Sequence, residues 1–297
     1  SPDSPSLYNA QLRLFKSGTL IDSIWSYFGA NEYSINAQPE NNHSILLNDE
    51  TLPQLAIEHY GFWPDGMITP PSDKAVYADI QAIKNMGFNL IINRSEMPSD
   101  RWFYWCDKIG ILVWQNYKSD YNQQHKPVED NLYKLSTHPS LVALTGGTEM
   151  NFQSKDKMSV HSAKYFISPK NEGKIQILYI NPDTAISSFD FDNYNYSSIG
   201  LGDEIEKAWE KVEDVSQIGS DPEKFSIAAI AYNTSNYNKI FVLAQQFARE
   251  NGISTIVYPQ LCDLPGQKLG LQTEDRRAFK VNLEQMLKIN HSLMNYN

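Results

Sequence analysis

Cysteine is scarce in this chain, long apolar runs are missing, and basic residues are outnumbered by acidic ones. Cys106 and Cys262 lie far apart without metal-ligand spacing, so we expect buried free thiols. No apolar stretch approaches the roughly 18 residues that a membrane-spanning helix needs. The net charge of −10 argues against nucleic-acid binding, because phosphates require basic patches. No signal peptide is visible, but Ser1 is compatible with a processing site, so that absence says little.

The chain has 297 residues, of which 41% are hydrophobic and 20% charged, as in ordinary globular proteins. That length accommodates a barrel of about 250 residues. Aromatic content is the unusual value, at 12% with 17 Tyr and 6 Trp. Aromatic rings stack on sugar rings, which favours a carbohydrate ligand, although the same residues also fill a large core and its rim. The sequence predicts neither a cofactor nor a metal site.

The first 44 residues differ in pattern from the rest. Residues 7–16 and 19–27 alternate apolar and polar side chains around Ser17-Gly18, which predicts a hairpin, and a third short strand is expected over 32–37. A β-sandwich takes about seven strands, so three cannot close one. We therefore interpret residues 1–44 as a partial β-sandwich segment, followed by a domain over residues 45–297.

From residue 45 onward, strand and helix patterns alternate. One helix is expected from an N-cap at Ser72 or Asp73 to just before Gly87. The other predicted helices are 100–109, 236–250 and 274–292, and the predicted strands are 55–58, 88–92, 111–115, 141–145, 174–180, 194–199, 225–231 and 253–258. Repeated strand–helix units favour a parallel sheet with helices outside it. Eight strands predict closure as a (β/α)8 TIM barrel.

A carboxyl group stands at the end of one predicted strand. The apolar run after His138 ends in Thr148-Glu149, and such strand ends are where a (β/α)8 barrel places its chemistry. Retaining sugar hydrolysis needs two carboxyl groups about 5 Å apart, one as acid/base and one as nucleophile. Glu149 is the candidate acid/base; the alternative is a leftover carboxylate that is hydrogen-bonded or solvated.

Several segments recur in a known enzyme family. They are GFWPDG at 61–66, PPSD at 70–73, NMGFN at 85–89, WCDKIG at 105–110, LVW at 112–114, VYPQ at 257–260, GL at 270–271 and DR at 275–276. In combination they resemble glycoside hydrolase family 2, in its β-galactosidase-like branch. The opening of the chain resembles the end of that family's immunoglobulin-like domain, and the likeness is faint between residues 152 and 226.

The resemblance implies a glycosidase barrel, a carbohydrate ligand, missing sandwich domains of a longer polypeptide, and a periplasmic or secreted location. The site departs from the family pattern, however. The family's acid/base follows an Asn, whereas Thr148 precedes Glu149 here. Other positions also differ. His59 and Tyr60 stand where the family often has Asp-Gln, and Ile92 and Arg94 stand where it usually has Arg and His. Asn116 stands where an acidic residue is usual.

The family's nucleophile is a Glu at the end of strand seven. Residues 225–233 read FSIAAIAYN, and no carboxylate occurs between Glu223 and Glu250. We therefore predict that the nucleophile is absent. Removing one member of a catalytic unit typically lowers the rate by several orders of magnitude.

Eight further residues are candidates for substrate binding: Trp114, Asn116, Thr148, His59, Trp63, Tyr232, Gln260 and Asp263. Several of these residues also have a structural interpretation. Trp114 and Trp63 either stack on sugar or cap the core. Gln260 and Asp263 bind hydroxyl groups or order their own loop, and a lone His59 is more often structural.

Three functions remain open from the sequence. The first is a glycan-binding or catalytically impaired relative of family 2 β-glycosidases. The second is an active retaining β-glycosidase that uses Glu149 and a nucleophile not recognised in the sequence. The third is a structural scaffold that binds no ligand.

Overall fold

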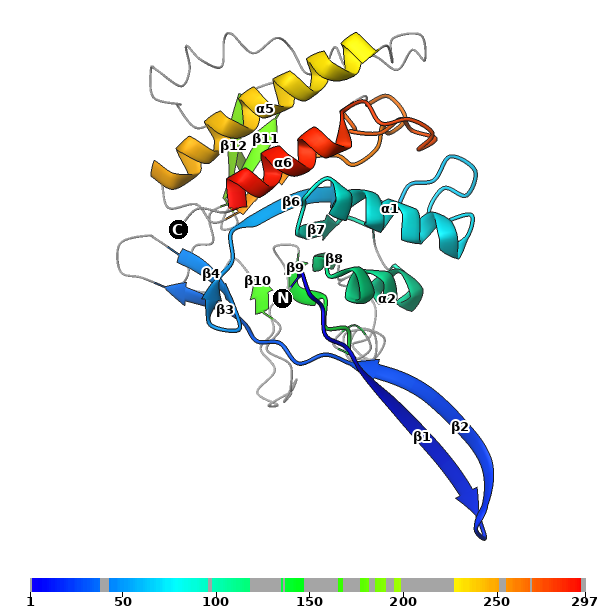
Figure 1. Ribbon diagram of the computed structural model, residues 1–297. Helices are drawn as coiled ribbons and strands as arrows, with labels where there is room; N and C mark the ends of the chain where they lie inside the picture. The colour runs from blue at the N-terminus through cyan, green and yellow to red at the C-terminus, as the bar shows by residue number, and fades with distance from the viewer. Residues whose placement is uncertain are drawn as a thin grey trace.

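The computed structural model describes residues 2–37, 43–95, 98–117, 135, 137–146, 165–167, 177–181, 185–190, 195–198, 227–250, 255–267 and 269–294. These residues form a mixed α/β body and an N-terminal hairpin that projects from it (Figure 1).

The body is built on a sheet whose central strands are parallel. Its strands in spatial order are β10 (Tyr165–Ile167), β9 (Leu141–Gly146), β8 (Leu112–Tyr117), β7 (Leu90–Asn93), β6 (Gln54–His59), β14 (Thr255–Tyr258), β11 (Ile177–Asn181), β12 (Ala185–Asp190) and β13 (Asn195–Ser198). Pairing is parallel from β10 through β11 and antiparallel from β11 to β13. The parallel centre places the carboxyl ends of consecutive strands on one edge.

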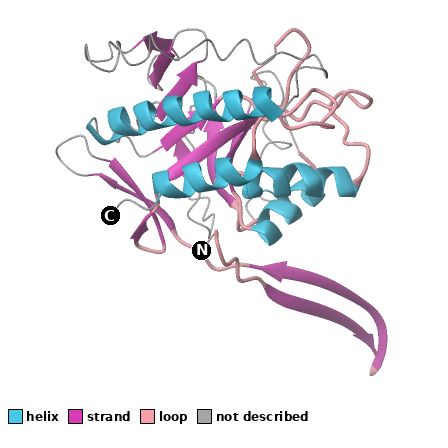
Figure 2. Cartoon of the chain, turned by 45° about the horizontal axis from the view of Figure 1, so that its top comes forward, coloured by secondary structure: helices cyan, strands magenta, loops and turns pink. Residues whose placement is uncertain are grey.

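Four helices are described: α1 (Asp73–Asn85), α2 (Asp100–Ile109), α5 (Ile227–Glu250) and α6 (Leu283–Met294). The hydroxyl of Ser72 accepts a hydrogen bond from the backbone N–H of Ala75 and caps α1. Gly110 ends α2 in the left-handed conformation, with φ of 80°. These two helices confirm the sequence prediction. Figure 2 shows the helices in front of the sheet.

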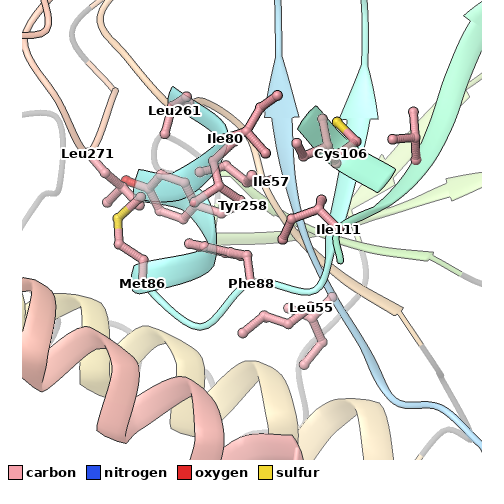
Figure 3. Packing of buried hydrophobic residues seen from close by; sticks show 14 of the residues in the cluster. Leu55, Ile57, Ile80, Met86, Phe88, Cys106, Ile111, Tyr258, Leu261 and Leu271 are labelled. Carbon is pink, nitrogen blue, oxygen red and sulfur yellow. The ribbon is translucent and has the colours of Figure 1, made fainter. Parts of the chain in front are cut away.

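Apolar side chains pack on both faces of the sheet. On the helix face, Leu55 and Ile57 belong to one buried cluster with side chains of α1, α2, α5 and α6. Figure 3 shows part of this cluster, including Ile80 of α1 and Cys106 of α2. On the other face, Ala56, Ile92 and Trp114 pack together with Tyr33. This alternation is the two-residue period of strands buried on both faces. The same period determines which face of the sheet each side chain at a strand end points toward.

The predicted seventh strand, residues 225–231, is wrong where the structure describes it. Residues 227–231 form the first turns of α5, continuous with the helix predicted over 236–250. A short apolar run does not distinguish a strand from a buried helix, and its alanines favour the helix. The strand beside β14 is instead β11.

Two further elements differ from the prediction, one in its pairing and one in its first residue. The segment near 194–199 forms β13, but it pairs antiparallel with β12 and so does not continue the strand–helix repeat. The last helix begins at Leu283 rather than near residue 274, because residues 273–276 form a tight turn in which Arg276 has φ of 59°. The described ladder runs from β10 to β13, and its closure into a barrel stays a prediction.

The N-terminal segment contains the predicted hairpin. Strands β1 (Tyr8–Lys16) and β2 (Thr19–Phe28) pair around Ser17 and Gly18, both with positive φ, as a tight hairpin turn requires. The third strand, β3 (Tyr33–Ala37), does not join them. It pairs with β4 (His43–Leu47), which pairs with β5 (Glu50–Thr51). This small sheet spans the predicted boundary at residue 44, and the division into two domains stays a prediction.

One face of the hairpin is apolar and exposed. Tyr8 pairs with Phe28 and Leu12 with Ile24, so these side chains share a face, and each is more than half exposed. The polar residues Asn9, Gln11 and Arg13 alternate with them on the other face. Within the described residues the apolar face has no cover, which is unusual because an isolated two-stranded hairpin is marginally stable at best.

The base of the hairpin is fixed to the body by a buried carboxylate. Asp107 of α2 accepts a 2.7 Å hydrogen bond from the hydroxyl of Tyr27 and another of 2.7 Å from the backbone N–H of Ser140. The Nδ1 atom of His138 lies 2.8 Å from the same oxygen that Tyr27 contacts. Burial and the neighbouring Asp107 raise the pKa of Tyr27 well above its usual value, so Tyr27 acts as the donor.

We expect Asp107→Asn to lower the free energy of unfolding by about 2–4 kcal/mol, because several buried donors lose a charged acceptor. Urea unfolding followed by circular dichroism measures this loss. The control is Asp73→Asn, which removes an exposed ion pair with Arg101 and should cost much less. Equal losses in the two variants would contradict the assigned role of Asp107.

Candidate functional site

The carboxyl edge of β6, β7 and β8 carries a group of polar side chains. Glu58 lies two residues after Ala56, Arg94 two after Ile92, and Asn116 two after Trp114. Strand alternation therefore directs all three to the face opposite the helices. We call these three residues and Tyr60 the edge cluster.

Glu58 is the centre of the edge cluster. Its oxygen Oε1 accepts hydrogen bonds from two nitrogens of Arg94, namely Nε at 2.8 Å and Nη2. Its oxygen Oε2 accepts a 2.7 Å bond from the hydroxyl of Tyr60. Both oxygens of a buried carboxylate are thus engaged, as burial of a charge requires.

The cluster is reachable from solvent even though Glu58 is not. The side chain of Glu58 is 5% exposed and that of Arg94 24%, while Tyr60 is 40% exposed. Asn116 is half-buried. A ligand at this edge would therefore contact Tyr60, Arg94 and Asn116, with Glu58 behind them.

A second layer of amides holds the cluster in place. Asn93 donates a 2.7 Å hydrogen bond to Gln115, and Gln115 donates 2.8 Å bonds to the carbonyl oxygens of Ser95 and Asn116. The hydroxyl of Ser95 donates back to Asn93 at 2.9 Å. These connected bonds, of which the one between Asn93 and Gln115 is buried, rigidify the start of both loops and thereby orient Arg94 and Asn116.

The side chains of three predicted site residues lie outside the described part of the structure. Thr148 and Glu149 lie outside the described residues. Tyr232 was expected just after a strand, but it lies on α5, and its side chain is not described.

Trp114 lies in the core. It is fully buried, and its indole N–H donates a 3.2 Å hydrogen bond to the hydroxyl of Tyr33. Tyr33 also accepts a 2.8 Å bond from Gln54. These contacts support the structural alternative for Trp114, and sugar stacking by this ring receives no support from the structure.

Trp63 and His59 belong to a clamp between the loops after β6 and β14. Arg276 lies 3.8 Å from the centre of the Trp63 ring and donates 2.9 Å hydrogen bonds to Asp79. His59 contacts Asp79 through Nε2 at 3.3 Å and accepts the backbone N–H of Gly61 through Nδ1 at 3.2 Å. Both predicted residues are buried and face the helix side rather than the edge cluster.

Gln260 and Asp263 order the loop that follows β14. The amide of Gln260 donates a 2.7 Å hydrogen bond to the carbonyl oxygen of Cys262. Asp263 forms a fully buried ion pair with Lys280 at 2.6 Å and accepts the backbone N–H of Gly270 at 3.0 Å. Their contacts fit the loop-ordering alternative, and any role in sugar binding stays a prediction.

Within the described residues, neither an activated cysteine nor a metal site is present. Both cysteines are free and buried, as expected, and burial raises the pKa of the Cys262 thiol to about 11. Such a thiol is not an activated nucleophile. Within the described ranges, no group of His, Cys, Asp and Glu side chains could hold a metal ion, and no helix there is long and apolar enough to span a membrane.

Sequence reasoning missed Glu58 because it read the residue only as the end of a strand. The signal was nonetheless present as a pair of linked departures. The family pattern has Arg at position 92, whereas this chain has an Arg at 94 and a carboxylate on the neighbouring strand at 58. The register places Glu58 opposite Ile92. Arg94 lies two residues beyond Ile92, close enough for its guanidinium to contact Glu58.

No family model and no curated protein matches the chain. Solved structures of glycosidases do match. The family 2 β-galacturonidase of Eisenbergiella tayi, bound to galacturonate, is 19% identical with a TM-score of 0.60, covering 100% of this chain and 60% of its own. The β-glucuronidase of Parabacteroides merdae is 14% identical with a TM-score of 0.58, covering 100% of this chain and 43% of its own.

A β-glycosidase of Bacteroides vulgatus matches half of the chain, with 22% identity and a TM-score of 0.44, and the match covers 20% of that enzyme. The chain thus spans less than two thirds of each of these structures. Together with the mixed α/β sheet, the two longer matches show that the chain has a glycosidase-like fold.

Proposed function

We propose that this chain is a relative of family 2 β-glycosidases that binds glycan at the edge cluster and in which hydrolysis is impaired. The geometry of Glu58 carries this proposal: a carboxylate stands at the carboxyl edge of the sheet, but both of its oxygens are already bonded. Parallel α/β sheets bind ligands at this edge, and the two whole-chain structural matches are both glycosidases.

The edge cluster has the chemistry that sugars require. A sugar hydroxyl both donates and accepts hydrogen bonds, and Asn116 offers both an amide donor and a carbonyl acceptor. The phenol ring of Tyr60 presents an exposed apolar surface with a polar tip. A pyranose ring can therefore pack on Tyr60 while its hydroxyls meet Asn116 and the Glu58–Arg94 pair.

The same geometry argues against efficient hydrolysis by the described residues. Retaining hydrolysis requires a carboxylate free to attack the anomeric carbon and a second carboxyl group about 5 Å away. Arg94 and Tyr60 occupy the two oxygens of Glu58. Glu149 remains the proposed proton donor.

We expect titration calorimetry against a panel of neutral oligosaccharides to give heat of binding for the parent chain. Tyr60→Ala and Asn116→Ala should each weaken binding at least about tenfold, the equivalent of 1.4 kcal/mol. The matched control is Tyr77→Ala, because Tyr77 has the same exposed fraction but lies on α1. No heat with any glycan would favour the scaffold, and equal loss in Tyr60→Ala and Tyr77→Ala would exclude the edge cluster.

An active retaining β-glycosidase is the second candidate, and one observation favours it. The lack of a carboxylate between Glu223 and Glu250 counted against a nucleophile only if residues 225–231 were a strand. Residues 227–231 are helical, and β11 takes the place beside β14.

We expect chromogenic β-galactosides and β-mannosides to show no turnover that depends on Glu149. Parent chain, Glu149→Gln and Glu58→Gln should therefore be equally inactive, and a fluorosugar probe should leave the chain mass unchanged. Turnover in the parent that either substitution abolishes, or a trapped glycosyl adduct, would establish the active glycosidase instead.

The exposed hairpin supports a proposal about partners. The apolar face formed by Tyr8, Leu12, Ile24 and Phe28 is the inward face of an amphipathic sheet that lacks its second layer. We propose that further β-strands of a longer polypeptide cover it and complete a sandwich. The glycosidase matches are consistent with this, since 40% or more of each matched structure lies outside the match.

We expect the 297-residue chain alone to self-associate through this face, because large exposed apolar patches drive association. Leu12→Thr combined with Ile24→Thr should shift the chain toward monomer in sedimentation velocity. The control pair Gln11→Thr and Arg13→Thr changes the polar face instead and should not. A monomeric parent chain whose hairpin resists protease would contradict the need for a cover.

A further inference from the structure

We infer that His59 is a positioning residue for the edge cluster: its neutral ring, with the hydrogen on Nε2, fixes the turn that places Tyr60 against Glu58. The inference rests on the proposed function, because the edge cluster is the proposed binding site. His59 itself is 4% exposed and contacts Asp79 of α1, on the helix side of the sheet. It therefore acts through its neighbours rather than by contact with a ligand.

The hydrogen bonds of the His59 ring determine which nitrogen carries the hydrogen. The backbone N–H of Gly61 is only a donor, so the Nδ1 atom that lies 3.2 Å from it is an acceptor without a hydrogen. In a neutral imidazole the other nitrogen then carries the hydrogen. Nε2 therefore donates to the Oδ2 atom of Asp79 at 3.3 Å.

Asp79 is an acceptor that stays satisfied without His59. Its side chain is 4% exposed, and both of its oxygens accept 2.9 Å hydrogen bonds from Nε of Arg276. Arg276 thus compensates the buried charge. Replacing His59 consequently removes the bonds of the ring without leaving an unpaired carboxylate behind.

The bond from Gly61 to His59 closes a turn in a confined place. Gly61 has φ of 68°, in the left-handed region that favours glycine. A Cβ atom at Gly61 would lie 2.8 Å from the Cβ atom of Ser95, so the loops after β6 and β7 approach closely here. Ser95 belongs to the amide network of Asn93 and Gln115. The turn is therefore held between that network and the His59 ring.

Tyr60 stands inside this turn. Its hydroxyl donates a 2.7 Å hydrogen bond to Glu58, which points to the face opposite to His59. Because the backbone of residue 60 lies between His59 and Gly61, the bond between these two residues limits where the phenol ring can point. Loss of that bond frees the backbone after β6 and lets Tyr60, already 40% exposed, turn away from Glu58.

Three substitutions of His59 separate its acceptor from its donor. In His59→Asn, the Oδ1 atom replaces the Nδ1 acceptor beside Gly61. In His59→Gln, the side-chain NH₂ group replaces the Nε2 donor beside Asp79. His59→Leu removes both. Asp79 keeps its ion pair with Arg276 in all three variants.

Amide hydrogen exchange, followed residue by residue by NMR, tests the turn without any glycan. The Gly61 amide should exchange at least about tenfold more slowly in the parent and in His59→Asn than in His59→Gln and His59→Leu, because only the first two keep an acceptor for it. A long-range proton–nitrogen spectrum of the parent should show the His59 ring with its hydrogen on Nε2. The control His291→Asn changes an exposed histidine of α6 and should alter neither result.

Glycan affinity should follow the acceptor, whereas stability should follow the donor. In calorimetry, His59→Asn should bind glycan within about threefold of the parent, and His59→Gln and His59→Leu should bind at least about tenfold more weakly. The midpoint of thermal unfolding should instead be higher in His59→Gln than in His59→Asn, since only Gln keeps the contact with Asp79. A merely structural role would make affinity and unfolding midpoint change in the same order.

The two proposals fail in different ways. If the folded parent binds no glycan, the proposed function is overturned, while the exchange of Gly61 and the hydrogen position still decide whether His59 fixes the turn. If glycan binds but the His59 ring carries its hydrogen on Nδ1, the inference is overturned and glycan binding stands. Equal Gly61 exchange in His59→Asn and His59→Gln, or affinity that follows the unfolding midpoint, has the same consequence.

Discussion

The ion pair between Glu58 and Arg94 is the interaction on which the order of the polar groups at the carboxyl edge of the sheet depends. A carboxylate buried at a strand end is costly unless it is paired and hydrogen-bonded, and Arg94 and Tyr60 together meet that need. The pair joins the ends of β6 and β7, and the amide network of Asn93 and Gln115 carries this order to β8. The position of each polar group at the edge therefore follows from satisfying one buried charge.

Buried carboxylates with polar partners also occur elsewhere in the body. Asp79 joins α1 to the loop after β14 through Arg276 and to the end of β6 through His59, and Asp263 joins two parts of that loop through Lys280. Asp107 joins α2, β2 and the start of β9. Asp79 and Asp107 thereby link segments that are distant in sequence. Breaking such a link by removing one partner leaves an uncompensated buried charge, which is strongly destabilising.

Local signals made much of the fold predictable. The cap at Ser72 and the left-handed Gly110 marked helix ends, and apolar runs marked β6 through β9. Residues 227–231 were misread because their alanine-rich run has no period that separates strand from helix. The short β13 was found, but its antiparallel partner could not be predicted, since pairing depends on distant segments.

The site was less predictable than the fold. Trp114 and His59 were chosen for their side-chain chemistry, and the sequence did not show that both would be buried in contact with Tyr33 and Asp79. Glu58 was passed over because its sequence signal was spread over two strands, and the sequence alone did not show that these strands are neighbours. Only the register between β6 and β7 shows that Arg94 lies beside it.

The most direct measurement is a crystal structure of the chain with a neutral monosaccharide bound. The account predicts the sugar at the carboxyl edge, with hydroxyls on Asn116 and on the Glu58–Arg94 pair, and with that pair intact. A crystal in which Arg94 is turned away from Glu58, or in which the sugar binds away from both, would contradict it.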